Sequence, residues 1–308
     1  MSQEVLAWII FNIFIIITLA FDLGVFQKQH KEMKIREALI WSVIWILVAL
    51  LFNVGIYFVR GKEVALNFFT GYLLERSLSV DNIFVFIIIF SHLKVPSLYQ
   101  HKVLALGIFG ALIMRAVFIV AGVALIQQFE WVIYILGAFL VFTGIKMALN
   151  VEEDIDIEKN VLLAAMRRWF PVTANYHEDK YFVKREGKMF LTPLFIVVVL
   201  ITVTDIVFAM DSIPAIFAVT KDAFIVYSSN AMAVMGLRAM YFAVNNLVEL
   251  FHYLKYGLAI ILIVLGIKML TEHFIHIPVF FTLFFIAFVL GVSIFLSVSM
   301  QKNKVKKS

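Results

Sequence analysis

Nine apolar stretches dominate this sequence, and each is close to the ~20 residues that an α-helix needs to cross ~30 Å of hydrocarbon. The composition agrees, because 63% of the 308 residues are hydrophobic and 15% are charged, against about 45–50% and about 25% in soluble domains. We therefore predict an all-α polytopic membrane protein with nine transmembrane helices in one membrane domain, residues 1–308. The stretches are Val5–Phe26, Ala38–Val59, Val64–Phe90, Val103–Ile126, Trp131–Leu149, Pro193–Val219, Ala223–Val248, Tyr256–Thr271 and Pro278–Ser299.

The lysine and arginine residues between the stretches predict the orientation. Loops that would share one side of the membrane contain eighteen of them, and loops on the other side contain three. Because cytoplasmic loops retain basic residues, we expect the N-terminus outside and the C-terminus in the cytoplasm. Five basic residues remain within the stretches, namely Arg76, Arg115, Lys146, Arg238 and Lys268.

An internal repeat links the third to fifth stretches with the sixth to eighth. Glu75-x5-Asp81-Asn82 matches Asp205-x5-Asp211-Ser212, Arg115 matches Arg238, and Gly-Ile-Lys-Met occurs at both 144–147 and 266–269. Each unit has three crossings, an odd number, so the second unit is predicted to be inverted relative to the first. Inverted repeats are typical of secondary transporters, which bind substrate near the bilayer midplane and alternate by rocking one repeat against the other.

The repeat divides the chain into segments. Two N-terminal helices occupy residues 1–63, the two three-helix units occupy 64–149 and 192–272, and the final helix with a basic tail occupies 273–308. The polar segment 150–191 between the units is predicted to be a cytoplasmic loop. Its acidic start is compatible with a solvated connector and with a regulatory or metal-delivering loop.

Four acidic residues lie within the repeated stretches, where a charge costs on the order of 2.5–3.5 kcal/mol. We expect Glu75 and Asp205 near the midplane, with Asp81 and Asp211 flanking them on opposite approaches. Pro214 cannot donate a backbone hydrogen bond to the Met210 carbonyl, which adds a free oxygen beside Asp211. An oxygen-rich site suits Mn²⁺, Mg²⁺ or Ca²⁺. The candidate metal ligands are Glu75, Asp81, Asn82, Asp205, Asp211 and Ser212, with the thioether of Met210 as a further candidate.

Arg115 and Arg238 lie within the fourth and seventh stretches and are the expected charge partners of these acids. Two interpretations follow. The carboxylates bind a transported cation, or they form static ion pairs that hold the helices together. Their recurrence at equivalent positions, each with an Asn or Ser neighbour, favours transport.

Three segments carry a resemblance to a known family. Glu75–Asn82, Thr204–Ala215 and Phe21–Phe26 resemble the signature segments of the TerC family of bacterial integral membrane proteins, and of its Alx-like branch in particular. The resemblance implies a bacterial inner-membrane protein that exports Mn²⁺, with ion-site roles for Glu75, Asp81, Asn82, Asp205, Asp211 and Ser212. It adds Asp22 as a further metal or proton site.

We therefore expect a secondary exporter of divalent cations, chiefly Mn²⁺, by antiport with protons. Its partners are the lipid bilayer and the transported cation, and no nucleic acid or resident cofactor is expected. The alternative is a non-transporting membrane scaffold or a subunit of a stress or metalation complex, which includes a role in tellurium resistance. In that case the intramembrane ion pairs are structural. The sequence contains no HExxH motif and no Ser/His constellation at membrane depth, so we expect no enzymatic activity.

Overall fold

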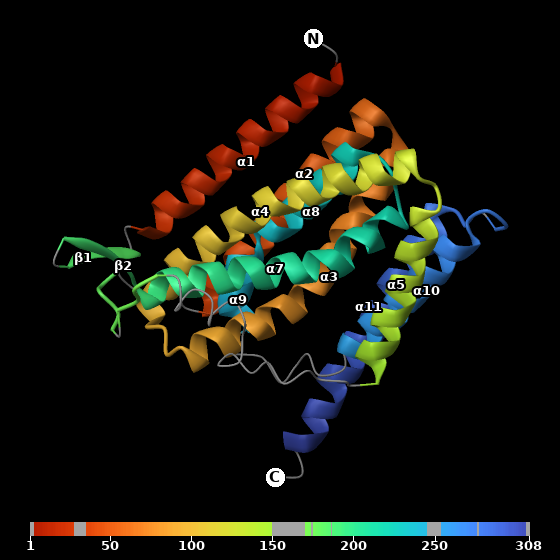
Figure 1. The fold of residues 1–308 in the computed structure, drawn as a ribbon. Coiled ribbons are helices and arrows are strands. Elements are labelled where there is room, and N and C mark those ends of the chain that lie inside the picture. Colours follow the sequence, from red (N-terminus) through yellow and green to blue (C-terminus); the bar gives the residue numbers. More distant parts are fainter. Residues whose placement is uncertain are drawn as a thin grey trace.

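The computed structural model describes residues 3–27, 35–149, 170–173, 175–185, 187–244, 254–275 and 277–305. Helices occupy all nine predicted apolar stretches (Figure 1). They are α1 (Gln3–Gln27), α2 (Ile35–Arg60), α3 (Lys62–His92), α4 (Ser97–Gln128), α5 (Val132–Ala148), α7 (Pro193–Phe217), α8 (Ala223–Met235), α9 (Leu237–Val244), α10 (Leu254–Thr271) and α11 (Val279–Val305). The seventh predicted stretch is divided between α8 and α9.

Five helices in the described parts of the chain are long and apolar enough to cross a membrane. They are α2, α4, α7, α10 and the segment Val279–Ser297 of α11. Large apolar side chains stay exposed on these helices, such as Phe58 of α2 at 80% and Phe284 of α11 at 65%, as expected of surfaces that face lipid. The chain is therefore an all-α multi-pass integral membrane protein. α3 has 31 residues, but Glu75, Arg76 and Asp81 interrupt its apolar character.

The centre of the molecule is formed by α3, α4, α7 and α8. α3 packs against α7 and α8, and α4 packs against the same two helices. Small residues permit the close approach. A Cβ on Gly71 of α3 would lie 2.8 Å from Ser229 Oγ of α8, and a Cβ on Gly107 of α4 would lie 2.6 Å from Ile201 Cγ2 of α7. The middles of these four helices therefore meet around one point.

α5 and α10 form the tightest helix pair, and they lie side by side with α11 at a steep angle to the other helices (Figure 1). A Cβ on Gly137 would lie 3.0 Å from the carbonyl oxygen of Gly266, and a Cβ on Gly144 would lie 2.8 Å from the carbonyl oxygen of Ala259. The two contacts run in opposite directions along the sequence, so the helices are antiparallel. We call this contact the glycine seam.

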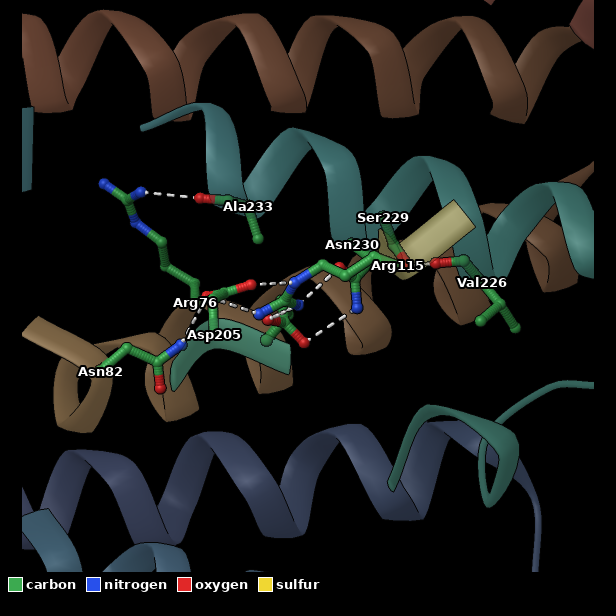
Figure 2. Close-up of polar contacts among 9 residues, drawn as sticks. Arg76, Asn82, Arg115, Asp205, Val226, Ser229, Asn230 and Ala233 are labelled. Carbon is green, nitrogen blue, oxygen red and sulfur yellow. Dashed lines mark hydrogen bonds and ion pairs between the residues drawn. The ribbon is translucent and has the colours of Figure 1, made fainter. Parts of the chain in front are cut away.

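A break at Gly236 separates α8 from α9. The guanidinium of Arg76, on α3, donates a hydrogen bond of 3.0 Å to the carbonyl oxygen of Ala233 in the last turn of α8 (Figure 2). Carbonyls in the last turn of a helix lack intrahelical partners, and Arg76 supplies one. The break was not expected, because the seventh apolar stretch, Ala223–Val248, predicts one continuous helix.

Part of the predicted loop 150–191 is folded. The strands β1 (Phe182–Arg185) and β2 (Lys188–Leu191) form an antiparallel hairpin, with Phe182 opposite Leu191. The hydroxyl of Tyr176 donates to the carbonyl of Leu93 at 2.7 Å. Lys102 of α4 pairs with Asp179, and this hydrogen bond holds the pKa of the Asp179 carboxyl below its usual range. The segment before α7 is therefore docked on the loop between α3 and α4 and on the start of α4. The acidic run lies outside the described residues.

Candidate cation site

Arg115 of α4 lies at the point where the four central helices meet. Its side chain is 1% exposed, and it contacts residues from three other helices. The guanidinium forms ion pairs with Glu75 of α3 and Asp205 of α7, and it donates a hydrogen bond of 2.7 Å to Asn230 Oδ1 of α8. Figure 2 shows Arg115 between Asp205 and Asn230. Arg115, which we predicted as a charge partner of the buried acids, thus pairs with both Glu75 and Asp205.

Asp205 is held by both of its carboxylate oxygens. Arg115 Nε donates to Oδ2 at 2.8 Å and Nη2 donates to Oδ1 at 3.1 Å. The amide of Asn82, from α3, donates to Oδ1 at 3.2 Å. This two-pronged arrangement fixes the planes of both charged groups.

Glu75 is held differently. Its Oε1 accepts from Arg115 Nη1, and its Oε2 accepts from the amide nitrogen of Asn230 at 3.0 Å. Arg115, Glu75, Asp205 and Asn230 are each at most 2% exposed. We call these four residues the Arg115 cluster. It contains two carboxylates and one guanidinium, so its formal charge is −1 when both acids are ionised.

A small cavity lies beside the cluster. Its volume is about 50 Å³, and its lining residues are Glu75, Leu78, Asp81, Asn82, Met147, Phe208, Asp211, Ser212 and Leu262. A buried water needs about 10–15 Å³, so the space admits an ion with a few waters. The cavity therefore lies between α3, α7 and the α5–α10 pair. Its oxygen atoms that could bind a metal ion come from α3 and α7.

Two side chains of the cavity differ in how they are satisfied. Asp211 accepts a hydrogen bond of 3.2 Å from the hydroxyl of Thr143 on α5. The hydroxyl of Ser212 is 2% exposed and has no hydrogen-bond partner among the described residues. An unsatisfied buried hydroxyl costs about 1–3 kcal/mol, so Ser212 is available to a bound ligand.

Known proteins resemble this chain along most of its length. Residues 60–305 match the "Integral membrane protein TerC family". The chain belongs to the TerC family. An uncharacterized membrane protein of Myxococcus xanthus is 46% identical over 296 residues, covering 96% of this chain and 93% of its own.

Other TerC relatives have a more specific name. A protein of Escherichia coli named "Putative membrane-bound redox modulator Alx" is 44% identical over 283 residues, covering 89% of this chain and 88% of its own. One of Salmonella typhi with the same name is 41% identical over 311 residues, covering 98% and 97%. No solved structure matches the chain. The resemblance to the TerC family and its Alx-like branch is thus confirmed.

The structure brings the predicted TerC site residues into two adjoining groups. Glu75, Asp81, Asn82, Asp211 and Ser212 all line the cavity, whereas Asp205 lies one hydrogen bond away, through Asn82. We expected Asp81 and Asp211 on opposite approaches, but both line the same cavity. No three histidine, aspartate or glutamate side chains in the described parts of the chain are grouped closely enough to hold a metal ion. Glu75 and Asp205 form ion pairs with Arg115, so the six predicted residues do not form a preassembled metal-binding site.

The remaining predicted residues lie elsewhere. Met210 is 54% exposed and does not line the cavity. Arg238, the second predicted charge partner, is buried in α9, beyond the break at Gly236. Asp22 lies on α1, but its side chain is outside the described residues.

Two residues at the site, Asn230 and Thr143, were not predicted from the sequence. Neither is charged, so neither stands out within its apolar stretch. A signal did exist for Asn230, because an amide in a membrane helix is costly without a partner. The hydroxyl of Thr143 lies one residue before the repeated Gly-Ile-Lys-Met and gave no comparable signal.

Proposed function

We propose that this TerC protein exports divalent cations, chiefly Mn²⁺, through the cavity between α3, α7 and the α5–α10 pair. The observation that carries the proposal is the cavity lining. Asp81, Asp211, Asn82 and Ser212 face one small space, and the Ser212 hydroxyl has no hydrogen-bond partner in the described parts of the chain. Carboxylate, amide and hydroxyl oxygens are ligands that suit Mn²⁺. The excess negative charge of the neighbouring Arg115 cluster favours a cation there.

Protons are the proposed counter-ion. Each acid of the cavity can exchange a bound cation for a proton, which keeps the buried charge low in both directions of transport. Asp81 and Asp211 line the cavity, so they are the candidates for this exchange. The export direction and the bacterial inner membrane as location belong to the same proposal.

The inverted repeat and the predicted topology, with nine crossings, the N-terminus outside and the C-terminus in the cytoplasm, are also proposals. The glycine seam supports the repeat. Gly137 and Gly144 correspond to Ala259 and Gly266 at the repeat offset of 122 residues, so the contact of Gly137 with Gly266 maps onto the contact of Gly144 with Ala259. The packing of α3 on α8 likewise corresponds to that of α7 on α4. Such reciprocal contacts are expected of two units related by a two-fold axis.

Replacement of Asp211 tests the proposal. Wild type, Asp211→Asn and Glu130→Gln would be expressed in a manganese-sensitive bacterium, and intracellular manganese would be measured. Glu130 is exposed and lies outside the cavity, which makes Glu130→Gln the matched control. We expect wild type and Glu130→Gln to lower intracellular manganese and Asp211→Asn to fail. If Asp211→Asn lowers manganese as well as wild type does, the site is assigned wrongly.

Transport by purified protein would define the substrate. In proteoliposomes, flux of Mn²⁺ would be compared with that of Ca²⁺, Mg²⁺ and Zn²⁺, with and without a pH gradient. We expect Mn²⁺ flux that a pH gradient drives. Absence of flux for all four ions would reject the exporter.

A second candidate function is a membrane scaffold or complex subunit with structural ion pairs. The pairing of Arg115 with both Glu75 and Asp205 favours it, because this is what static pairs would form. The relatives named redox modulators suggest a third direction. The 308 residues contain no cysteine, so a redox role of this chain would need a group other than a thiol. A scaffold would leave without a role the cavity-lining acids Asp81 and Asp211 and the Ser212 hydroxyl, which has no partner among the residues that the structure describes.

A further inference from the structure

Glu75 belongs both to the Arg115 cluster and to the cavity. It lines the cavity together with Asp81 and Asp211, yet both of its oxygens already have partners in the Arg115 cluster, Oε1 with Arg115 and Oε2 with Asn230. The Glu75 carboxylate can therefore either stay bonded to Arg115 and Asn230 or bind a cation in the cavity. The residues that hold it on Arg115 determine how many carboxylates are available to that cation.

Arg115 holds its two carboxylates unequally. Asp205 receives two separate N–H groups, from Nε and Nη2, and a third bond from Asn82. Glu75 receives only Nη1, and that same nitrogen also donates to Asn230. A paired, bidentate contact fixes a carboxylate more firmly than a single contact. Glu75 is therefore the carboxylate that the cluster can release.

Asn230 completes the hold on Glu75. Its amide orientation is determined by its partners, because a guanidinium only donates hydrogen bonds and a carboxylate only accepts them. Its oxygen therefore faces Arg115, and its nitrogen faces Glu75. Asn230 is 1% exposed, so no water replaces this donor readily. An amide also holds the carboxylate without neutralising it.

We propose that Asn230 is a positioning residue that keeps the Glu75 carboxylate paired with Arg115 and so withholds it from a cation in the cavity. The inference concerns the placement of Glu75, and its consequence for transport rests on the proposed function. With Asn230 in place, Asp81 and Asp211 are the acids open to the cavity. Without it, Oε2 loses its donor, and Glu75 turns toward the cavity as a third acid.

Loss of the Asn230 amide should therefore increase the affinity for the cation and decrease the rate of transport. A third carboxylate strengthens cation binding, and a cation held more tightly leaves more slowly. We expect the dissociation constant for Mn²⁺ to fall about tenfold when the amide is removed, in line with the net value of one hydrogen bond to a charged group. The maximal transport rate should fall at the same time.

The test uses the purified full chain with three substitutions. Asn230→Leu replaces the amide by an apolar group of similar size, and Asn230→Ala removes it without introducing bulk. Asn67→Leu is the matched control, since Asn67 is a partly buried asparagine of α3 whose side-chain oxygen has no partner among the described residues. Elution as a single species in size-exclusion chromatography would identify the folded variants.

Two measurements separate the inference from the proposed function. Labelling by a hydrophobic carbodiimide, followed by mass spectrometry of the peptide containing Glu75, reports whether the carboxyl is held or free, and it requires no metal. Equilibrium binding gives the dissociation constant for Mn²⁺. Transport in proteoliposomes gives the Mn²⁺ concentration at half-saturation and the maximal rate, so together they report how the substitution changes binding and transport of the cation.

We expect both Asn230 variants to increase labelling of Glu75 and to bind Mn²⁺ more tightly, and Asn67→Leu to match wild type. Unchanged labelling of Glu75 in the folded Asn230 variants would overturn the inference, even where wild type binds Mn²⁺. Increased labelling in a protein that binds no Mn²⁺ would support the positioning role and reject the proposed function. A general loss of rate at unchanged affinity and labelling would show a structural role only and would also overturn the inference.

Discussion

At the scale of single residues, Arg115 makes four hydrogen bonds to three buried side chains from three other helices. It neutralises one of two carboxylates that are at most 2% exposed, and it orders Asn230. A buried ion pair stabilises a fold weakly compared with apolar packing, but removal of one partner leaves an uncompensated charge. The cost of losing Arg115 is therefore much larger than the net value of its pairs.

Arg115→Leu should lower the free energy of unfolding by about 3–5 kcal/mol. Thermal unfolding in detergent would measure the change. Arg60→Leu is the control, because Arg60 pairs with Asp222 at 2.8 Å where the side chains are 36% and 28% exposed, and such pairs contribute about 0–1 kcal/mol. Equal melting temperatures for Arg115→Leu and wild type would contradict the structural importance of the cluster.

The residues of the site were predictable to the extent that they are charged. Glu75, Asp81, Asp205 and Asp211 are conspicuous because a carboxylate in an apolar stretch is costly, and Asn82 and Ser212 follow from the repeat. Their division between the Arg115 cluster and the cavity was not predictable. It depends on the rotation of α3 and α7 about their axes when they pack, which a sequence pattern does not contain.

At the scale of the elements, the glycine seam has little room for added volume, because backbone atoms of the facing helix lie close to its glycines. A Cβ on Gly144 would lie 2.7 Å from Ile263 Cγ1 and 2.8 Å from the Ala259 carbonyl oxygen, whereas Gly55 of α2 has nothing within 4 Å of such a Cβ. The backbone of α10 cannot yield to a side chain on α5 without separating the helices.

Gly144→Val should therefore destabilise the protein by about 1–3 kcal/mol, the usual cost of overpacking. Gly55→Val, in an open position, should have a much smaller effect. Comparison of the two melting temperatures in the same detergent checks this prediction. A smaller loss at Gly144 than at Gly55 would show that α5 and α10 are not in close contact.

Helix positions followed from apolar length, but the break at Gly236 did not. Glycine is frequent within membrane helices, so a single one gives little reason to divide a span. The decisive partner of the break is Arg76, whose side chain reaches Ala233 from α3. A contact over 157 residues of sequence has no signature in the local pattern.

At the scale of the whole molecule, the nine predicted crossings fix on which side each loop lies. The loop between α2 and α3 should face outward, and the loop between α3 and α4 should face the cytoplasm. The prediction rests on the distribution of lysine and arginine. It has a direct test because the sequence contains no cysteine, so one introduced thiol is the only one to react.

Lys62→Cys and Ser97→Cys mark the two loops at the ends of α3, and both positions are exposed. In intact cells, a membrane-impermeant maleimide should label Lys62→Cys at once and Ser97→Cys only after permeabilisation. Labelling of both thiols from the same side would mean that α3 does not cross the membrane. The reverse pattern would invert the whole topology.

The glycine seam joins a helix from each half of the chain, and this limits how the molecule can move. In the proposed inverted repeat, α5 belongs to the first unit and α10 to the second, so the two units could not rock apart as intact bodies while the seam stays closed. The cavity lies where this pair meets α3 and α7, with Met147 and Leu262 on one wall and the acids on the other. The α5–α10 pair is thus a rigid unit made of one helix from each half of the chain. For a substrate to enter or leave the cavity, this pair would have to move as one body against the four central helices.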